Sequence, residues 1–237
     1  MNILITGGTG LIGHALSSAL LSDGHQISIL SRNPDKARNN LPSGVLPIKW
    51  DGRSAEGWGH LIEETDAVIN LAGESIAGDT LPAIITSRWN DENKNRIRTS
   101  RLNAGRALVS AIKNSKKKPK VFIQASAVGY YGPRGDEEIT ENAPAGTDFL
   151  AETCHVWEDS TAEIEGLGIR RAVIRTGLVL APQGGILPMI LLPFRLFAGG
   201  PLGSGEQYVP WIHLEDEVNA IRFLLNAEGA RGAYTLS

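Results

Sequence analysis

Residues 3–16, ILITGGTGLIGHAL, contain the clearest indication of the fold. An apolar run from Ile3 to Ile5 leads into a loop that contains Gly7 and Gly10, and a helical pattern that includes Gly13 begins directly after Gly10. In such a strand–turn–helix unit, Gly7 permits the tight turn, Gly10 lets the backbone approach a pyrophosphate, and Gly13 permits close helix packing. Unpaired N–H groups at the start of the helix attract phosphate oxygens. We therefore predict a dinucleotide site, against the alternative of a purely structural turn, formed by Gly7, Thr9, Gly10, Leu11, Ile12 and Gly13.

After residue 16, short runs rich in Ile and Val alternate with longer segments of helical spacing. This alternation predicts an α/β protein with a Rossmann-type, doubly wound parallel sheet. Asp23-Gly24 is a plausible end for the first helix. We expect strands at 2–6, 26–31, 46–49, 67–71, 120–126 and 170–175, with a short one at 233–236. We expect helices at 11–22, 87–114, 148–166 and 215–226.

Beyond residue 176 the chain becomes dense in Gly and Pro and too irregular for another βα unit. We predict that residues 1–176 form the nucleotide-binding domain. Residues 177–237 would be a small substrate-covering region packed on the same domain, over the carboxyl edge of the sheet, where such sheets bind ligands. The apolar run from Ile186 to Phe194, broken by two prolines, is interpreted as a core segment or a pocket lid.

Composition narrows the class of partner. The 237 residues carry a formal charge of −3, which favours neither nucleic acid nor an anionic membrane. The basic run 116–118 is interpreted as a solvated loop, so we expect a small-molecule partner. Cys154 is the only cysteine, which excludes an intrachain disulfide and a Cys-based metal site. The N-terminal residues do not resemble a signal peptide, and we expect a cytoplasmic protein.

The end of the second predicted strand, LSRNPDK at 30–36, bears on the choice of cofactor. An acid about 20 residues past the glycines binds the ribose hydroxyls of NAD. Neither Ser31 nor Arg32 is acidic, and Asp35 comes only after Pro34. The planar guanidinium of Arg32 can pair with a 2′-phosphate, with the Ser31 hydroxyl as a second donor. The sequence therefore favours NADP, the alternative being a surface arginine at a strand end.

Four further motifs accompany the glycine loop, namely VINLAGE at 68–74, SRWNDENKNRIRTSR at 87–101, SAVGYYG at 126–132 and GGPLGSGEQYVPWIH at 199–213. With these in the right order over essentially the whole chain, the sequence resembles the short-chain dehydrogenase/reductase superfamily. It is most similar to an atypical branch of the extended, nucleotide-sugar-epimerase-like group, whose members are called epimerase family proteins.

The resemblance implies a Rossmann-type sheet with NADP along its carboxyl edge. It places Asn70, Leu71, Ala72 and Gly73 under the adenosine side of the cofactor. Arg101 matches a position that reaches the cofactor phosphates, the alternative being a solvated helix arginine. The segment 175–180, with Val179, is similar to the strand that passes the nicotinamide, and PWIH at 210–213 to the lip of the substrate pocket.

The resemblance also bears on the assembly and on the C-terminal region. Extended relatives often form homodimers through two long helices, here 87–114 and 148–166. They usually continue well past a strand such as GAYTLS at 232–237, so we expect the C-terminal part of the pocket to be incomplete in this sequence.

Catalysis in this superfamily normally uses a Tyr as acid/base, with a Lys four residues later on the same helix face. The ammonium stabilises a phenolate that would otherwise form only near pH ~10. The expected positions hold Phe149 and Thr153, or Leu150 and Cys154 one residue on. Tyr130 has Arg134 at this spacing, but the intervening Gly and Pro argue against a helix. The usual pair is absent, as in the atypical branch.

Other groups remain as candidates around the predicted pocket. Ser126 matches the catalytic serine, although Ala127 could equally occupy that place, and Tyr131 matches an aromatic beside the nicotinamide. Glu74 could reach the pocket or only cap its loop. Trp211 belongs to the pocket lip, and His213 is either an acid/base or a structural group at a helix start. No pattern indicates a metal site.

Two interpretations follow. In the first, the protein is an NADP-dependent oxidoreductase or epimerase-like enzyme acting on a carbonyl compound or a sugar nucleotide, with Tyr131, His213 or water moving the proton. In the second, it binds NADP(H) without turnover, as a sensor or regulatory protein. A polar pocket built from Ser126, Tyr131, Trp211 and His213 would favour the enzyme.

Overall fold

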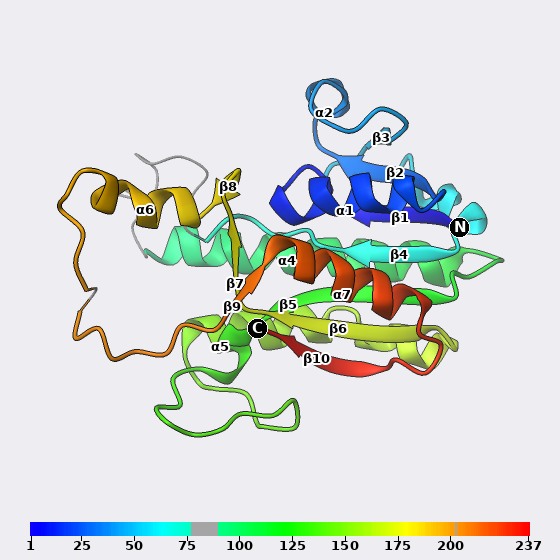
Figure 1. Ribbon diagram of the computed structural model, residues 1–237. Helices are drawn as coiled ribbons and strands as arrows, with labels where there is room; N and C mark the ends of the chain where they lie inside the picture. Colours follow the sequence, from blue (N-terminus) through cyan, green and yellow to red (C-terminus); the bar gives the residue numbers. More distant parts are fainter. Residues whose placement is uncertain (77–89, 202) are drawn as a thin grey trace.

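A seven-stranded parallel sheet forms the centre of the computed structural model, which describes residues 1–76, 90–201 and 203–237 (Figure 1). Its strand order is β10-β6-β5-β4-β1-β2-β3. The order reverses at β1, as in a doubly wound Rossmann sheet. The strands are β1 (Asn2–Thr6), β2 (Gln26–Ser31), β3 (Leu46–Lys49), β4 (Ala67–Asn70), β5 (Val121–Ala127), β6 (Arg170–Thr176) and β10 (Gly232–Leu236). The predicted fold class is confirmed, with strand bounds within a residue of those expected.

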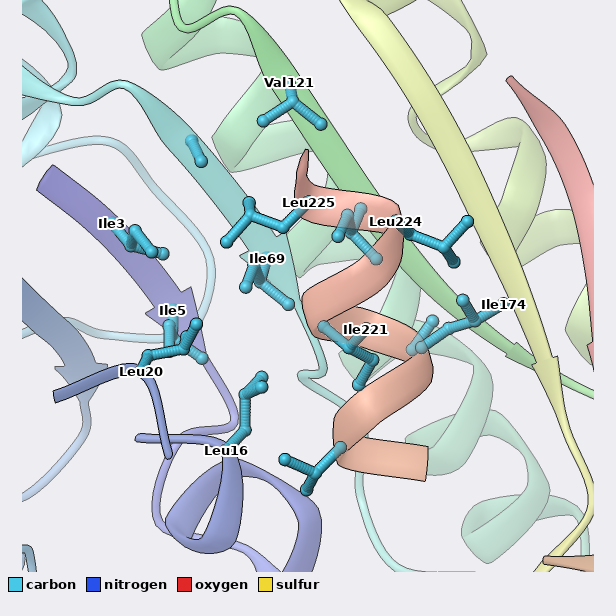
Figure 2. Close-up of a cluster of buried hydrophobic side chains, with 14 of the residues drawn as sticks. Ile3, Ile5, Leu16, Leu20, Ile69, Val121, Ile174, Ile221, Leu224 and Leu225 are labelled. Carbon is cyan, nitrogen blue, oxygen red and sulfur yellow. The ribbon is translucent and has the colours of Figure 1, made fainter. Parts of the chain in front are cut away.

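Helices cover both faces of the sheet. On one face, α1 (Leu11–Ser22) packs beside α7 (Leu214–Asn226) over β1, β4, β5 and β6. Figure 2 shows their side chains meeting those of the strands, for example Leu16 and Ile221 beside Ile69 and Ile174. On the other face, α4 (Asp91–Asn114) lies beside α5 (Phe149–Asp159). Burial of both faces explains why the strands have continuous apolar runs rather than alternating patterns.

The last helix is joined to the sheet by a buried arginine. Arg170, on the first residue of β6, donates from its guanidinium to the carbonyls of Leu224, Leu225 and Ala230. These carbonyls lie at the end of α7 or just after it and have no partner within the helix. The arginine therefore fixes α7 against β6 and fixes the turn that leads into β10.

The chain beyond residue 176 contains more regular structure than predicted. β7 (Leu178–Ala181), β8 (Gly184–Gly185) and β9 (Trp211–His213) form a second sheet in the order β8-β7-β9. Between β8 and β9 lies α6 (Leu187–Arg195), with Pro188 in its first turn and Pro193 inside it. α7 and β10 then return to the main layers. The predicted domain boundary at 176 stays a prediction.

Two predicted segments need correction. The apolar run at 186–194 is not a core segment, because α6 has no buried residue and Phe194 is 55% exposed. The helix predicted at 148–166 ends at Asp159, and a separate 3-10 turn, η3, spans Ala162–Leu167. The break has a cause: the buried Thr161 hydroxyl donates to Gln124 and accepts from Arg171, contacts that draw the backbone out of the helix.

The remaining short elements lie in the connections. They are α2 (Pro34–Arg38), η1 (Gly59–Glu64) and η2 (Val128–Tyr131). The helix predicted at 87–114 begins at Asp91 with Asn90 as its cap, and residues 87–89 lie outside the described residues. In the described ranges, no helix is both long and apolar enough to cross a membrane.

Candidate functional site at the carboxyl edge of the sheet

The predicted site residues gather at one edge because the strands of the large sheet are parallel. The glycine loop follows β1, Arg32 follows β2, the segment 71–74 follows β4, and Ser126 lies near the end of β5. Ligands of open α/β sheets bind outside this edge, where the strand order reverses. Here the strand order reverses between β1 and β4, and the glycine loop follows directly after β1.

The glycine loop is compact because its glycines leave room for backbone contacts. Gly7 has φ +70, and a Cβ on it would lie 2.5 Å from the Leu71 carbonyl oxygen. A Cβ on Gly13 would lie 2.5 Å from the Gly7 carbonyl oxygen. Gly10 is the N-cap of α1 and no side chain caps the helix. The first turn of α1, with exposed Thr9 and half-buried Leu11 and Ile12 beside it, therefore presents backbone N–H groups toward the edge.

The second sheet contacts this loop. Cβ atoms on Gly184 and Gly185 of β8 would lie 3.5 and 3.0 Å from the Leu11 side chain. The same Gly185 position is 3.7 Å from the Val179 carbonyl oxygen on β7. The structure thus brings the predicted residues Leu11 and Val179 into one region, at the start of α1.

At the end of β2, the Arg32 side chain is exposed and Ser31 is half-buried. The Ser31 hydroxyl accepts from the Asn33 N–H at 3.2 Å, and the Arg32 carbonyl accepts from Lys49 Nζ at 2.5 Å. These contacts hold the backbone of the turn while leaving the guanidinium of Arg32 at the surface. A Cβ on Gly52 would lie 3.9 Å from Arg32 Cδ, so the loop after β3 borders the same position.

The segment 71–74, which follows β4, is held in place by side chains of α4. Arg101 is 8% exposed, and its guanidinium donates to the carbonyls of Glu74 and Ile97 and lies 4.7 Å from the Trp157 ring. Burial lowers its pKa below the usual range. A Cβ on Gly73 would lie 2.9 Å from Arg101 Cζ, so a larger residue here would require the guanidinium to shift. The alternative of a solvated helix arginine is wrong, while contact with cofactor phosphates stays a prediction.

The polar side chains of this segment point to internal partners. Glu74 forms an ion pair with Arg96 at 2.8 Å, and its N–H donates to Ser100 Oγ. Asn70 is fully buried, accepts from Thr6 Oγ1 at 2.6 Å and donates to Gln124 Oε1 at 2.9 Å. Leu71 and Ala72 then follow with half-buried side chains. These contacts hold the loop against α4, and the contacts of Glu74 with Arg96 and Ser100 are part of them.

Ser126 and Tyr131 lie in one buried hydrogen-bond network centred on Arg175 and Glu158. Arg175 Nε and Nη2 each donate at 2.9 Å to a carboxylate oxygen of Glu158. The Ser126 hydroxyl donates to the same carboxylate at 2.6 Å. Tyr131 OH accepts from Arg175 Nη1 at 3.0 Å and shares a 3.0 Å hydrogen bond with Thr235 of β10. We refer to these residues as the Arg175 network.

Two electrostatic features characterise the Arg175 network. Burial alone would lower the pKa of Arg175, but the hydrogen bonds that it donates to Glu158 and Tyr131 raise it above its ordinary value. The guanidinium also lies 3.5 Å from the centre of the Tyr130 ring, a cation–π contact. Arg175 is therefore a permanent cation that orients Tyr131 directly, while its partner Glu158 orients Ser126, and both hydroxyl residues are 4% exposed.

The other predicted candidates lie apart from this network. Trp211 and His213 are on β9, with Trp211 56% exposed. His213 caps α7, where its Nδ1 accepts from the Glu215 N–H at 3.3 Å. This contact is the structural role considered from the sequence. Cys154 is buried, and burial raises the pKa of its thiol to about 11, which disfavours a reactive thiolate. The described residues contain no cluster suited to a metal.

Sequence reasoning missed Glu158, Arg175 and the buried Glu217 described below. Arg175 lies in a strand whose seven residues are all buried, and the apolar pattern that revealed β6 does not explain its three arginines. This excess of arginines in a core strand is a signal for internal ion pairs, since a buried guanidinium needs partners. Nothing in the sequence around Glu158 or Glu217 distinguishes them from solvated helix residues.

The sheet order and the glycine loop at its reversal point together define a Rossmann-type dinucleotide-binding protein. The chain belongs to the NAD dependent epimerase/dehydratase family, whose model matches residues 3–236. It is 40% identical to epimerase family protein YfhF of Bacillus subtilis over 98% of this chain and 72% of that protein. It is also 40% identical to the chloroplastic epimerase family protein SDR39U1 homolog of Arabidopsis thaliana, over 98% of this chain and 64% of that one.

Solved structures agree with this assignment. The human epimerase family protein SDR39U1, crystallised with NADPH, superposes with a TM-score of 0.85 at 34% identity, covering 100% of this chain and 74% of that one. A nucleoside-diphosphate sugar epimerase from Corynebacterium glutamicum gives 0.80 at 33% identity, covering 99% and 46%. The resemblance inferred from sequence motifs is confirmed. These relatives extend over more residues than the chain matches.

Proposed function

We propose that this protein binds NADP(H) along the carboxyl edge of its large sheet. The observation that carries the proposal is the exposed Arg32 at the end of β2, where an NAD-binding site has an acid, beside a glycine loop of the right geometry. A guanidinium there can pair with the 2′-phosphate that distinguishes NADP from NAD. NADPH in the human relative's crystal structure supports the same choice.

The residues present fit such a cofactor. The space that a Cβ on Gly7 or Gly13 would fill is taken by backbone, so the loop stays tight while the uncapped start of α1 can receive a pyrophosphate. Ser31 and Arg32 would hold the adenosine ribose and its phosphate, and Leu71 to Gly73 would border the adenosine. Val179 would border the nicotinamide end. When bound, NADPH supplies a hydride for transfer to a substrate.

We further propose that the protein is an oxidoreductase or epimerase-like enzyme acting on a small carbonyl compound or a sugar nucleotide. Family membership supports this class of reaction. Because Phe149 and Thr153, or Leu150 and Cys154 one residue on, occupy the positions of the usual Tyr and Lys, another group must hold or move the proton. Ser126 lies near the end of β5 and Tyr131 in the turn that follows it, and the Arg175 network orients both hydroxyl groups.

One observation favours a second candidate, an NADP(H) sensor without turnover. Both hydroxyl groups already have internal partners, and both are nearly excluded from solvent. Trp211 and His213 lie on β9 with exposed side chains, and the hydrogen bonds of Ser126, Tyr131 and His213 in the described part of the chain do not join the two pairs. The homodimer through α4 and α5 stays a prediction.

We expect Arg32→Ala to weaken NADPH binding by about tenfold or more, because hydrogen bonds to a charged group contribute about 1.5–3 kcal/mol. NADH binding should change by less than about threefold, since NADH has no 2′-phosphate. Fluorescence titration with both nucleotides measures this. Arg231→Ala is the matched control, because Arg231 is exposed at the opposite edge of the sheet, just before β10. Equal losses for both nucleotides would contradict the assigned role.

Turnover is tested by following NADPH absorbance with a panel of carbonyl compounds and sugar nucleotides. If the enzyme proposal is correct, one class of substrate oxidises NADPH, and Tyr131→Phe lowers kcat while leaving the Kd for NADPH nearly unchanged. Tyr208→Phe, which changes a residue that is 74% exposed, should leave both unchanged. Tight NADPH binding without any turnover would favour the sensor.

A further inference from the structure

Glu217 is a buried carboxyl group that the proposed function does not use. It lies in the first turn of α7 and is 0% exposed. Its Oε1 accepts from Thr176 Oγ1 at 2.8 Å. Its Oε2 has no hydrogen-bond partner among the described residues, and the only other buried side-chain atom in this condition is Trp157 Nε1. One donor is far less than a buried carboxylate requires.

The partner of Glu217 places it at the functional edge. Thr176 is the last residue of β6, opposite Ala127 of β5 and Leu236 of β10. The next residue, Gly177, donates its N–H to the Leu236 carbonyl, and a Cβ on it would lie 2.9 Å from the Pro210 carbonyl oxygen. The junction between β6 and β7 is thus tightly enclosed by backbone, and the Thr176–Glu217 hydrogen bond joins it to α7.

We propose that Glu217 is a positioning residue that holds the β6–β7 junction in its binding conformation only while it is protonated, and that NADP(H) affinity is linked to this proton. The inference rests on the proposed function, which puts the nicotinamide end beside this junction. A neutral carboxyl can stay in the core with Thr176 as its partner. A carboxylate needs further donors, which the enclosed junction can supply only by opening to water.

The surroundings of Glu217 contain no compensating charge. Burial raises the pKa of its carboxyl from 4.5 to about 7, and the Thr176 hydrogen bond acts in the opposite direction. The elements packed against α7 are α1, β5, β7 and β9, and hydrogen bonds from Arg170 and Thr176 join it to β6. Their charged or titratable side chains are His14 of α1 and His213 of β9, both exposed, and the three arginines of β6, which pair with other groups. None of them affects the pKa of Glu217.

The direction of the pH dependence follows from this shift. The folded protein binds the Glu217 proton more tightly than the unfolded chain does. Stability from the protonated group is therefore fully present below about pH 4.5 and is lost as the pH rises to and through about 7. If cofactor binding requires the same protonated form, NADPH affinity also falls over the upper part of this range.

The test compares the wild-type protein, Glu217→Gln and Asp216→Asn by NADPH titration and thermal unfolding between pH 5.5 and 8.5. Glutamine copies the neutral carboxyl at every pH, and Asp216 is an exposed acid on the same turn. Between pH 5.5 and 8.5, we expect the Kd of the wild type to rise at least about fivefold more than the Kd of Glu217→Gln, and the Tm of the wild type to fall. Asp216→Asn should behave like the wild type. Ionisation of the cofactor phosphate affects all three proteins alike.

Identical pH profiles for the wild type and Glu217→Gln, with NADPH bound by both, would overturn this inference and leave the proposed function intact. An Asp216→Asn profile as flat as that of Glu217→Gln would also overturn it. Absence of NADPH binding by the folded wild type at every pH would overturn the proposed function and the linkage together. If Glu217→Gln fails to fold, Thr176→Val replaces it. This variant lacks the hydrogen bond that lowers the pKa of Glu217, so the midpoint of its pH profile should lie above that of the wild type.

Discussion

Glu158→Gln should lower the free energy of unfolding by about 3–5 kcal/mol, because it leaves the buried Arg175 cation without its carboxylate. The two side chains are 6% and 12% exposed and form two parallel hydrogen bonds. The glutamine oxygen can still accept from Ser126 and Arg175 Nε, but its NH2 group then faces Arg175 Nη2, so two donors meet. Urea unfolding monitored by circular dichroism at neutral pH measures the change.

The control for this prediction is Glu163→Gln, which removes the carboxylate of an exposed ion pair with Lys113. Surface pairs contribute little to stability, so the unfolding midpoint should hardly move. The double variant Glu158→Met, Arg175→Met should be less destabilised than the sum of the two single changes, since it leaves no uncompensated charge. A Glu158→Gln protein as stable as the wild type would show that Arg175 finds another partner and that the network does not hold β5, β6 and α5 together.

Two glycines of the loop should respond differently to a single added methyl group. In Gly13→Ala, the new Cβ would lie 2.5 Å from the Gly7 carbonyl oxygen and from Gly8 Cα, both of which are backbone atoms. The loop must move, which should cost about 1–3 kcal/mol of stability and remove measurable NADPH binding. In Gly10→Ala, the Cβ would lie 3.4 Å from the Gly7 carbonyl oxygen, at a residue with ordinary φ −78.

Gly10→Ala should therefore fold with a nearly unchanged Tm and still bind NADPH about tenfold more weakly, because the methyl group stands where a pyrophosphate approaches the helix. Thermal unfolding and NADPH fluorescence titration on the same samples separate the two effects. Full NADPH affinity in Gly10→Ala would place the pyrophosphate elsewhere. A stable, binding-competent Gly13→Ala would contradict the close packing of α1 on the loop.

Local sequence signals predicted most of the fold because each element carries its own. The strands are continuous apolar runs, and Gly7, Gly13 and Gly24 mark real turns or close approaches. α6 was not predicted, because its two prolines and the flanking glycines are unfavourable for a helix in sequence-based reasoning. It also contributes no buried residue to the core. The end of α5 was misplaced because Thr161 is drawn away by residues of β5 and β6, which no local pattern reveals.

The site was predictable where backbone geometry defines it and unpredictable where side chains meet across the sheet. The glycine loop and Arg32 follow from spacing along the chain. The Arg175 network joins Ser126, Tyr131, Glu158 and Thr235 from four different elements. Its members lie far apart in the sequence, so their pairing depends on the register between β5 and β6 that only the folded sheet supplies.

The position of β10 has a consequence for the order of folding. β10 pairs with β6 in parallel, although all of residues 177–231 lie between them. Pairings between distant segments form slowly, because the loop must close before contacts stabilise it. During synthesis, one edge of β6 therefore remains unpaired until β10 has emerged, and Tyr131 lacks its Thr235 contact until then. We expect the final, slow phase of refolding to report β10 docking, with α1, β1 and β2 already formed.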